Sequence, residues 1–151
     1  MAARYTAPHE AAHALAAELL GVEILDVTVH LEGGGVTNRG FARAGADPEA
    51  FPVMMAAGLA GSLMAGQHPD DAEYGAKADL LWLRKLGHDE TEIASYTSRA
   101  TELLRAHEQA WRRLAWLLAA GTTVSGDTVR SVIAGEPVDG RLALDALELR
   151  A

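Results

Sequence analysis

The sequence predicts a predominantly helical α+β fold, in which a helix carrying the segment HEAAH packs beside a small β-sheet or hairpin and a helical bundle follows. Two observations predict the helices: the chain is 49% hydrophobic but only 5% aromatic, and its apolar residues recur at helical spacing. One stretch of alternating apolar and polar residues predicts a strand. Since 151 residues suit one core, we expect a single domain over 1–151, with its core at 6–135 and a tail at 136–151 whose pattern fits helix and strand equally.

The first elements are a helix and a strand. Thr6 can cap a helix whose first turn accepts Pro8, and Gly21 offers a stop. Residues 22–32 then alternate between apolar and polar side chains, the pattern of a half-buried strand. Three consecutive glycines permit a turn, so 36–43 could return as the second strand of a hairpin.

Later helices are bounded by local start and stop signals. Asp47 and Pro48 begin a buried helix of small residues, and Asp89 with Glu92 forms a capping pair for a long helix. Ser125 begins a short final helix. The predicted helix ends are at Gly66, Gly87, Gly121 and Gly135. Between the first two of these glycines, the polar segment 67–79 reads as a turn-prone loop, where we expect an acidic metal ligand.

Charge and composition exclude several classes of function. The net charge of −8 argues against nucleic acid as a partner, because phosphate-binding faces are built from clustered Lys and Arg. The chain has no cysteine, so a metal would be held by imidazole and carboxylate groups. Its N-terminus lacks the layout of a signal peptide, and its longest weakly polar run, 51–66, is too short to span a bilayer. We therefore expect a cytoplasmic protein without a membrane segment.

The HEAAH segment carries the clearest chemical signal. Residues four apart on a helix project from one face, so His9 and His13 can share one ion. Zinc (Zn²⁺) accepts neutral imidazoles, and Glu10 stands where a carboxylate can take a proton from a metal-bound water. The positive end of the nearby helix N-terminus would favour the neutral imidazoles. The motif predicts a zinc site with Glu10 as general base.

The spacing leaves the third ligand open. Asp79 begins an apolar helical pattern, so its carboxylate could point back toward the first helix or could simply cap its own helix. Four residues of the same polar segment compete for the role: His68, Asp70, Asp71 and Glu73.

The order of motifs resembles a known family. PHEAAHALAAELLG followed by VEILDVTVHLEGGG resembles the start of the peptidase domain of FtsH-type zinc proteases. YGAKADLLWLRKLG is similar to the family segment with the third zinc ligand, an aspartate, and the resemblance assigns that role to Asp79. ATELLRAHEQAWRRLAWLLAAGTTVSGDTVRSVIAG is similar to the closing helices, so the likeness covers most of Thr6 to Gly135. Ala12 replaces a family glycine, and the stretch 60–62 stands where the family has an acidic pair.

The resemblance implies a zinc metalloendopeptidase acting on flexible or unfolded polypeptide. A substrate chain could add to the edge of strand 22–32 through backbone hydrogen bonds. The sequence contains no GxxxxGK[ST] phosphate loop, so unfolding of a substrate would need a separate ATPase or adaptor. The long helix could serve as an assembly surface in a homo-oligomer.

Two other readings use the same motif. A stand-alone regulatory metalloprotease of the ImmA-like type would take Glu49 as its third ligand. A non-catalytic metal-binding or protein-interaction module would keep the scaffold without hydrolysis. For the remaining histidines a structural or solvated role is expected: His30, His88 and His107.

Overall fold

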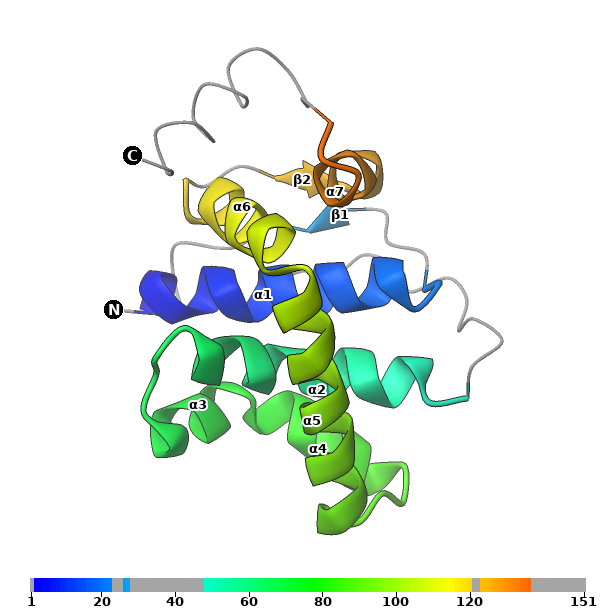
Figure 1. Ribbon diagram of the computed structural model, residues 1–151. Coiled ribbons are helices and arrows are strands. Elements are labelled where there is room, and N and C mark those ends of the chain that lie inside the picture. Colours follow the sequence, from blue (N-terminus) through cyan, green and yellow to red (C-terminus); the bar gives the residue numbers. More distant parts are fainter. Residues whose placement is uncertain (1, 23–25, 28–47, 121–122, 137–151) are drawn as a thin grey trace.

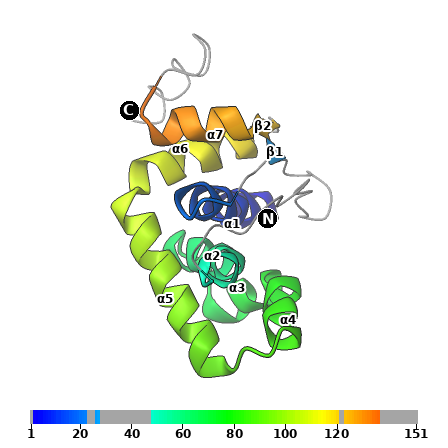
Figure 2. The same cartoon turned by 90° about the vertical axis from the view of Figure 1, so that its right-hand side faces the viewer.

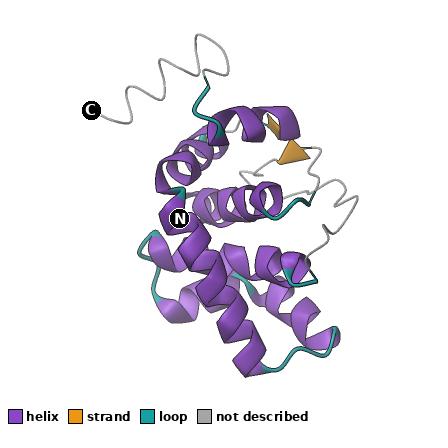
Figure 3. Ribbon diagram, turned by 45° about the vertical axis from the view of Figure 1, so that its right-hand side comes forward, coloured by secondary structure: helices purple, strands orange, loops and turns teal. Residues whose placement is uncertain are grey.

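The computed structural model describes residues 2–22, 26–27, 48–120 and 123–136, and these are predominantly helical (Figure 3). They form seven helices and two short strands: α1 (Ala2–Leu19), β1 (Asp26–Val27), α2 (Ala50–Met64), α3 (Pro69–Gly75), α4 (Lys77–Lys85), α5 (Glu90–Ala106), α6 (Glu108–Ala119), β2 (Val124–Ser125) and α7 (Gly126–Ile133). The helical part of the predicted fold is thus confirmed. No helix in these ranges is both long and apolar enough to cross a bilayer.

Helices α1 and α2 lie side by side at the centre of the molecule (Figure 1). On one side of this pair are α6, α7 and the two strands, and on the other are α3 and α4 (Figure 2). Helix α5 runs along the stack and packs mainly on α2. The helix that carries HEAAH is therefore covered by α2 on one side and by α6 on another.

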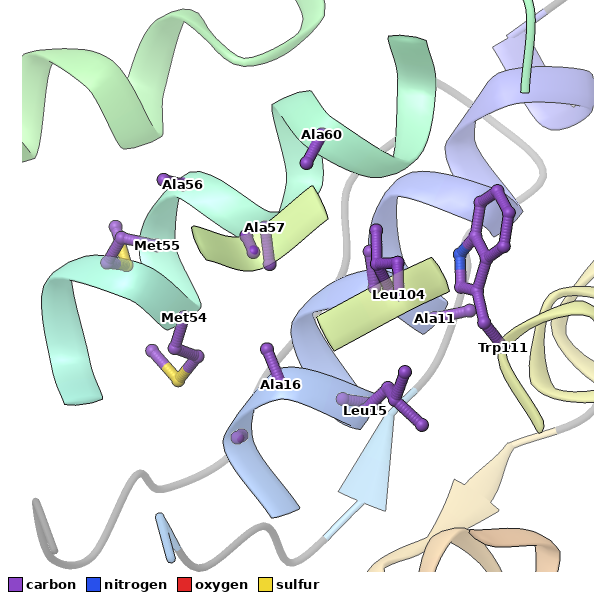
Figure 4. Close-up of a cluster of buried hydrophobic side chains, with 14 of the residues drawn as sticks. Ala11, Leu15, Ala16, Met54, Met55, Ala56, Ala57, Ala60, Leu104 and Trp111 are labelled. Atoms are coloured by element: carbon purple, nitrogen blue, oxygen red, sulfur yellow. The ribbon is translucent and has the colours of Figure 1, made fainter. Parts of the chain in front are cut away.

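Small side chains bring α1 and α2 close together. Ala11 of α1 and Ala57 of α2 are fully buried in the core (Figure 4). At Gly61, an added Cβ would lie 2.7 Å from the Ala12 Cβ and 2.7 Å from the Pro8 carbonyl oxygen. Two backbones can approach so closely only where side chains are this small. The alanine-rich composition thus serves a tight helix pair.

Helix α1 begins earlier than the sequence predicts. It starts at Ala2, so Thr6 is not its cap and Pro8 lies inside it. An interior proline removes one backbone hydrogen bond, but tertiary contacts hold this part of the helix: Ala7 is only 1% exposed, and the Trp111 indole N–H donates to the Pro8 carbonyl at 2.9 Å. HEAAH consequently lies in the middle of α1, and the predicted influence of a helix N-terminus on it is wrong.

The predicted hairpin is not confirmed. Of the predicted strand 22–32, the structure describes only Asp26–Val27 as strand, and the proposed return strand 36–43 lies outside the described residues. The partner of β1 is β2, far along the chain, which pairs antiparallel with Asp26 opposite Ser125. The sequence pattern detected a strand but could not identify its partner, because pairing depends on how the helices fold back.

Several predicted helix boundaries are confirmed. The helix stops at Gly66 and Gly87 have φ values of +92° and +93°, which favour glycine. The capping box is present, since the Asp89 carboxylate accepts from the Glu92 N–H at 2.8 Å and the Glu92 carboxylate accepts from the Asp89 N–H at 3.0 Å. The stop predicted at Gly121 lies outside the described residues.

Two helical predictions need correction. The segment 67–79, predicted as a loop, forms α3 and the start of α4. At the start of α3, His68 accepts a hydrogen bond from the Asp70 N–H at 3.2 Å, and Pro69 suits the first helical position. The predicted long helix breaks at His107, where φ is −125° and ψ is 35°. The break lets α5 pack on α2 while α6 packs on α1.

Truncation of a core leucine should test this packing. Leu104 of α5 is fully buried, whereas Leu81 of α4 is 49% exposed. We expect Leu104→Ala to lower the free energy of unfolding by about 3 kcal/mol through loss of buried contacts and the cavity left behind. The matched Leu81→Ala should cost less than about 1 kcal/mol. Urea denaturation measures both, and equal losses would contradict the core described above.

Candidate metal centre

Helix α1 buries three polar side chains at its centre. His9, Glu10 and His13 are 8%, 7% and 5% exposed. The two imidazoles meet edge to face, with ring centroids 4.7 Å apart, and their Nε2 atoms are separated by 3.1 Å. The i, i+4 spacing therefore places both Nε2 atoms at one point, as predicted.

Helix α4 brings Asp79 to the same point. The Oδ2 atom of Asp79 lies 3.0 Å from the His13 Nε2 and 3.2 Å from the His9 Nε2. Asp79 is in the first turn of α4, where the helix dipole favours a carboxylate, but the N-cap position belongs to Ala76. Its carboxylate therefore faces the histidines. Within the described residues, these three side chains form the one group of potential metal ligands, with donor atoms within 4.8 Å of one another.

Helix α2 fixes the orientation of the imidazoles. The His13 Nδ1 lies 2.7 Å from the Met54 carbonyl oxygen. Because a carbonyl can only accept, the Nδ1 of His13 carries a proton. When the ring is neutral, as metal binding requires, its Nε2 therefore directs a lone pair toward Asp79. On the other imidazole, the His9 Nδ1 lies 3.4 Å from the Ser62 hydroxyl. Hydrogen bonds of this kind on the outer ring nitrogen are typical of metal-binding histidines.

The centre of the site requires positive charge. Burial opposes protonation of His13, but the hydrogen bond to Asp79 and the charges of Asp79 and Glu10 raise its pKa to about 9. Burial would also raise the pKa of Asp79, yet hydrogen bonds from His13 and His9 and their charges hold it well below its ordinary value. A proton or a cation must lie between these atoms, because lone pairs facing one another at such distances repel.

Glu10 lies at the side of this group. Its Oε1 atom is 3.5 Å from the His9 Nε2. Burial raises the pKa of Glu10 above its ordinary value, and Asp79 adds to the rise, while His13 and His9 counteract it. A carboxylate with a raised pKa is a stronger base than an ordinary carboxylate, which suits it to accepting a proton.

The donor set fits a zinc-like ion. Two imidazole nitrogens and one carboxylate oxygen are a ligand set that zinc takes in catalytic sites, whereas calcium and magnesium prefer oxygen ligands throughout. Tetrahedral ligands at about 2.0–2.1 Å from zinc lie about 3.3 Å from each other. The separations here, between 3.0 and 3.2 Å, would need only a slight expansion.

The competing ligands are not part of this group. The carboxylate of Glu49 is 2.8 Å from the Arg99 guanidinium, at the N-terminal end of α2. Among the described residues, the potential ligand group also leaves out the four polar-segment candidates, all of which belong to α3 or its cap: His68, Asp70, Asp71 and Glu73.

The remaining histidines have other surroundings. His88 lies 3.1 Å from the Tyr96 hydroxyl, and His107 is the junction of α5 and α6. His30 lies outside the described residues. Neither His88 nor His107 belongs to the group of potential metal ligands among the described residues, and their structural or solvated role stays a prediction.

The sequence did not identify the support from α2. Met54 acts through its backbone, which leaves no trace in residue type, and Ser62 falls where the resembled family has an acidic pair. The run of small residues around Gly58 was the available signal. Such a run is typical of a helix that packs closely, but it does not indicate which face of α2 meets the histidines.

No protein-family model matches the chain, and no curated protein matches it either. The likeness to FtsH-type peptidase domains therefore stays a prediction that rests on the motifs.

Metal-free protein should show a pH-dependent contribution from the site. The ordinary pKa of histidine is about 6.5, and the pKa of His13 is raised to about 9. The stability that protonated His13 contributes is therefore fully present below about pH 6.5 and is lost as the pH rises through about 9. The lowered pKa of Asp79 gives stability that is lost as pH falls below its ordinary range. We expect Asp79→Asn to reduce the free energy of unfolding by about 2 kcal/mol near pH 6, and by much less at pH 10. Urea denaturation in EDTA measures the difference, and a constant difference from pH 6 to 10 would contradict this assignment.

Proposed function

We propose that the protein is a zinc-dependent peptidase-like hydrolase. The observation that carries this proposal is the convergence of the His9 Nε2, the His13 Nε2 and the Asp79 Oδ2 on one buried point, with Glu10 beside it. A structural zinc site is normally closed by four protein ligands, whereas three ligands with a neighbouring carboxylate are the pattern of hydrolytic sites.

Each side chain has a distinct role in this proposal. His9, His13 and Asp79 would hold the ion. When bound, zinc supplies Lewis acidity, which lowers the pKa of a water and polarises a substrate carbonyl. Glu10 would accept the proton of the attacking water and pass it to the leaving amine, a role for which its raised pKa is suited.

The exposure of the site supports a flexible polypeptide as substrate. The Asp79 side chain is 22% exposed, whereas those of His9 and His13 are 10% and 6% exposed. Of the three candidate ligands, the Asp79 side chain on α4 is therefore the most accessible to solvent. A flexible chain can bring a single peptide bond to donors that are this buried more easily than a folded surface can.

The proposed relation to FtsH-type peptidase domains rests on HEAAH and on Asp79. A separate ATPase or adaptor would supply unfolded substrate. Addition of substrate to strand 22–32 stays a prediction, because most of that segment lies outside the described residues.

Glu10→Gln should separate metal binding from hydrolysis. The amide keeps the shape of the side chain but cannot accept the proton, so we expect zinc content to be retained and peptide hydrolysis to fall at least about 100-fold. Metal analysis of the protein purified without added metal, paired with casein or peptide cleavage, measures both properties.

Cleavage at the parent rate by zinc-loaded Glu10→Gln would rule out the role of Glu10. If the parent itself binds zinc but cleaves no peptide, the non-catalytic metal-binding module is the better reading.

Substitution of the candidate third ligands should identify the true one. We expect Asp79→Ala to weaken zinc binding at least about 100-fold, because it removes one of three protein ligands. Glu49→Ala should leave the affinity unchanged, since its carboxylate bonds to Arg99. Competition with a chelating dye measures the two affinities, and the reverse order would favour the ImmA-like arrangement.

A further inference from the structure

One stripe of α2 lies against the two imidazoles of the metal centre. Met54, Gly58 and Ser62 are four residues apart, so they lie on one face of the helix. The Met54 carbonyl oxygen contacts the His13 Nδ1, and the Ser62 hydroxyl contacts the His9 Nδ1. The middle position, Gly58, stands between these two contacts.

Gly58 leaves room that the imidazoles occupy. A Cβ atom at this position would lie 2.4 Å from the His9 Cε1, 2.5 Å from the His9 Nε2 and 2.5 Å from the His13 Nε2. Carbon atoms in ordinary contact stay more than about 3.4 Å apart. Even one methyl group would therefore have to displace the rings.

The rings cannot yield without loss of contacts. His13 would give up its 2.7 Å hydrogen bond to the Met54 carbonyl, or its 3.0 Å contact with Asp79. His9 is similarly placed between Ser62 and Asp79. A side chain at position 58 thus acts on the two Nε2 atoms themselves.

The neighbouring Gly61 provides a contrast on the same helix. A Cβ there would meet the Ala12 Cβ and the Pro8 carbonyl oxygen, and neither belongs to an imidazole. Gly61 serves the packing of α1 on α2, whereas Gly58 faces the metal centre.

We propose that Gly58 is a positioning residue of the metal centre: its missing side chain lets α2 pack against both imidazoles. The Met54 carbonyl and the Ser62 hydroxyl can then hold the rings where their Nε2 atoms meet Asp79. This inference rests on the proposed metal-binding function. It implies that zinc affinity depends on a residue that donates no ligand atom.

A double-mutant cycle in metal-free protein tests the contact. Gly58→Ala and Gly61→Ala are each made in the parent and in a His9→Ala/His13→Ala background, and thermal unfolding is followed in EDTA. We expect Gly58→Ala to lower the Tm of the parent by several degrees, because the added methyl group displaces the imidazoles. In the His9→Ala/His13→Ala background there are no rings to displace, and alanine favours the helix over glycine, so the Tm should stay equal or rise. Gly61→Ala should lower Tm in both backgrounds. An equal loss from Gly58→Ala in both would overturn the proposal.

A spectroscopic measurement extends the test to the metal. Cobalt(II) is added to the parent and to Gly58→Ala, and its visible absorption and zinc competition are recorded. We expect the cobalt(II) complex of Gly58→Ala to lack the intense visible bands of a four-coordinate site. We also expect the affinity of Gly58→Ala for zinc to fall at least about tenfold. An unchanged spectrum and affinity in a folded Gly58→Ala protein would overturn the proposal. Should Gly58→Ala fail to fold in the parent, recovery of folding in the double-alanine background supports it.

The two proposals can fail separately. If the parent binds neither cobalt nor zinc, the proposed function falls, and with it the metal part of this inference. If the parent binds metal but the cycle shows no coupling between Gly58 and the histidines, only the role of Gly58 falls.

Discussion

Three electron-rich atoms meet in a buried space, and this convergence is the constraint on which the surrounding structure depends. The His9 Nε2, the His13 Nε2 and the Asp79 Oδ2 lie 3.0 to 3.2 Å from one another. Such an arrangement is unfavourable unless positive charge lies among the atoms. The close α1–α2 contact, the Met54 carbonyl and the placement of α4 all act to hold it.

The parts of the site that could be predicted are those encoded by local spacing or residue type. His9 and His13 share a helix face whatever the rest of the chain does, because the helix repeat fixes their separation. Asp79 needed more than spacing, since its pattern fitted a helix cap equally well, and the family resemblance favoured it as a ligand. Helix stops at Gly66 and Gly87 were equally local, because each needs a left-handed backbone conformation.

The parts that could not be predicted depend on contacts between distant segments. Helix α1 continues through Pro8, whose carbonyl accepts a hydrogen bond from Trp111, 103 positions along the chain. The partner of β1 is β2 rather than a neighbouring strand. The break at His107 follows from packing of α5 and α6 on different helices. Local propensity cannot encode such features, because they exist only once the helices have assembled.

The separation of the candidate ligands along the chain gives the site a further, topological consequence. His13 and Asp79 are 66 positions apart, and α2 and α3 lie between them. An ion bound by both would close this stretch into a loop, much as a disulfide does. Because the loop is long, such a cross-link would reduce the conformational entropy of the unfolded chain more than a cross-link between neighbouring residues. In a chain without cysteine, the metal centre would then act as a reversible cross-link whose closure depends on metal supply.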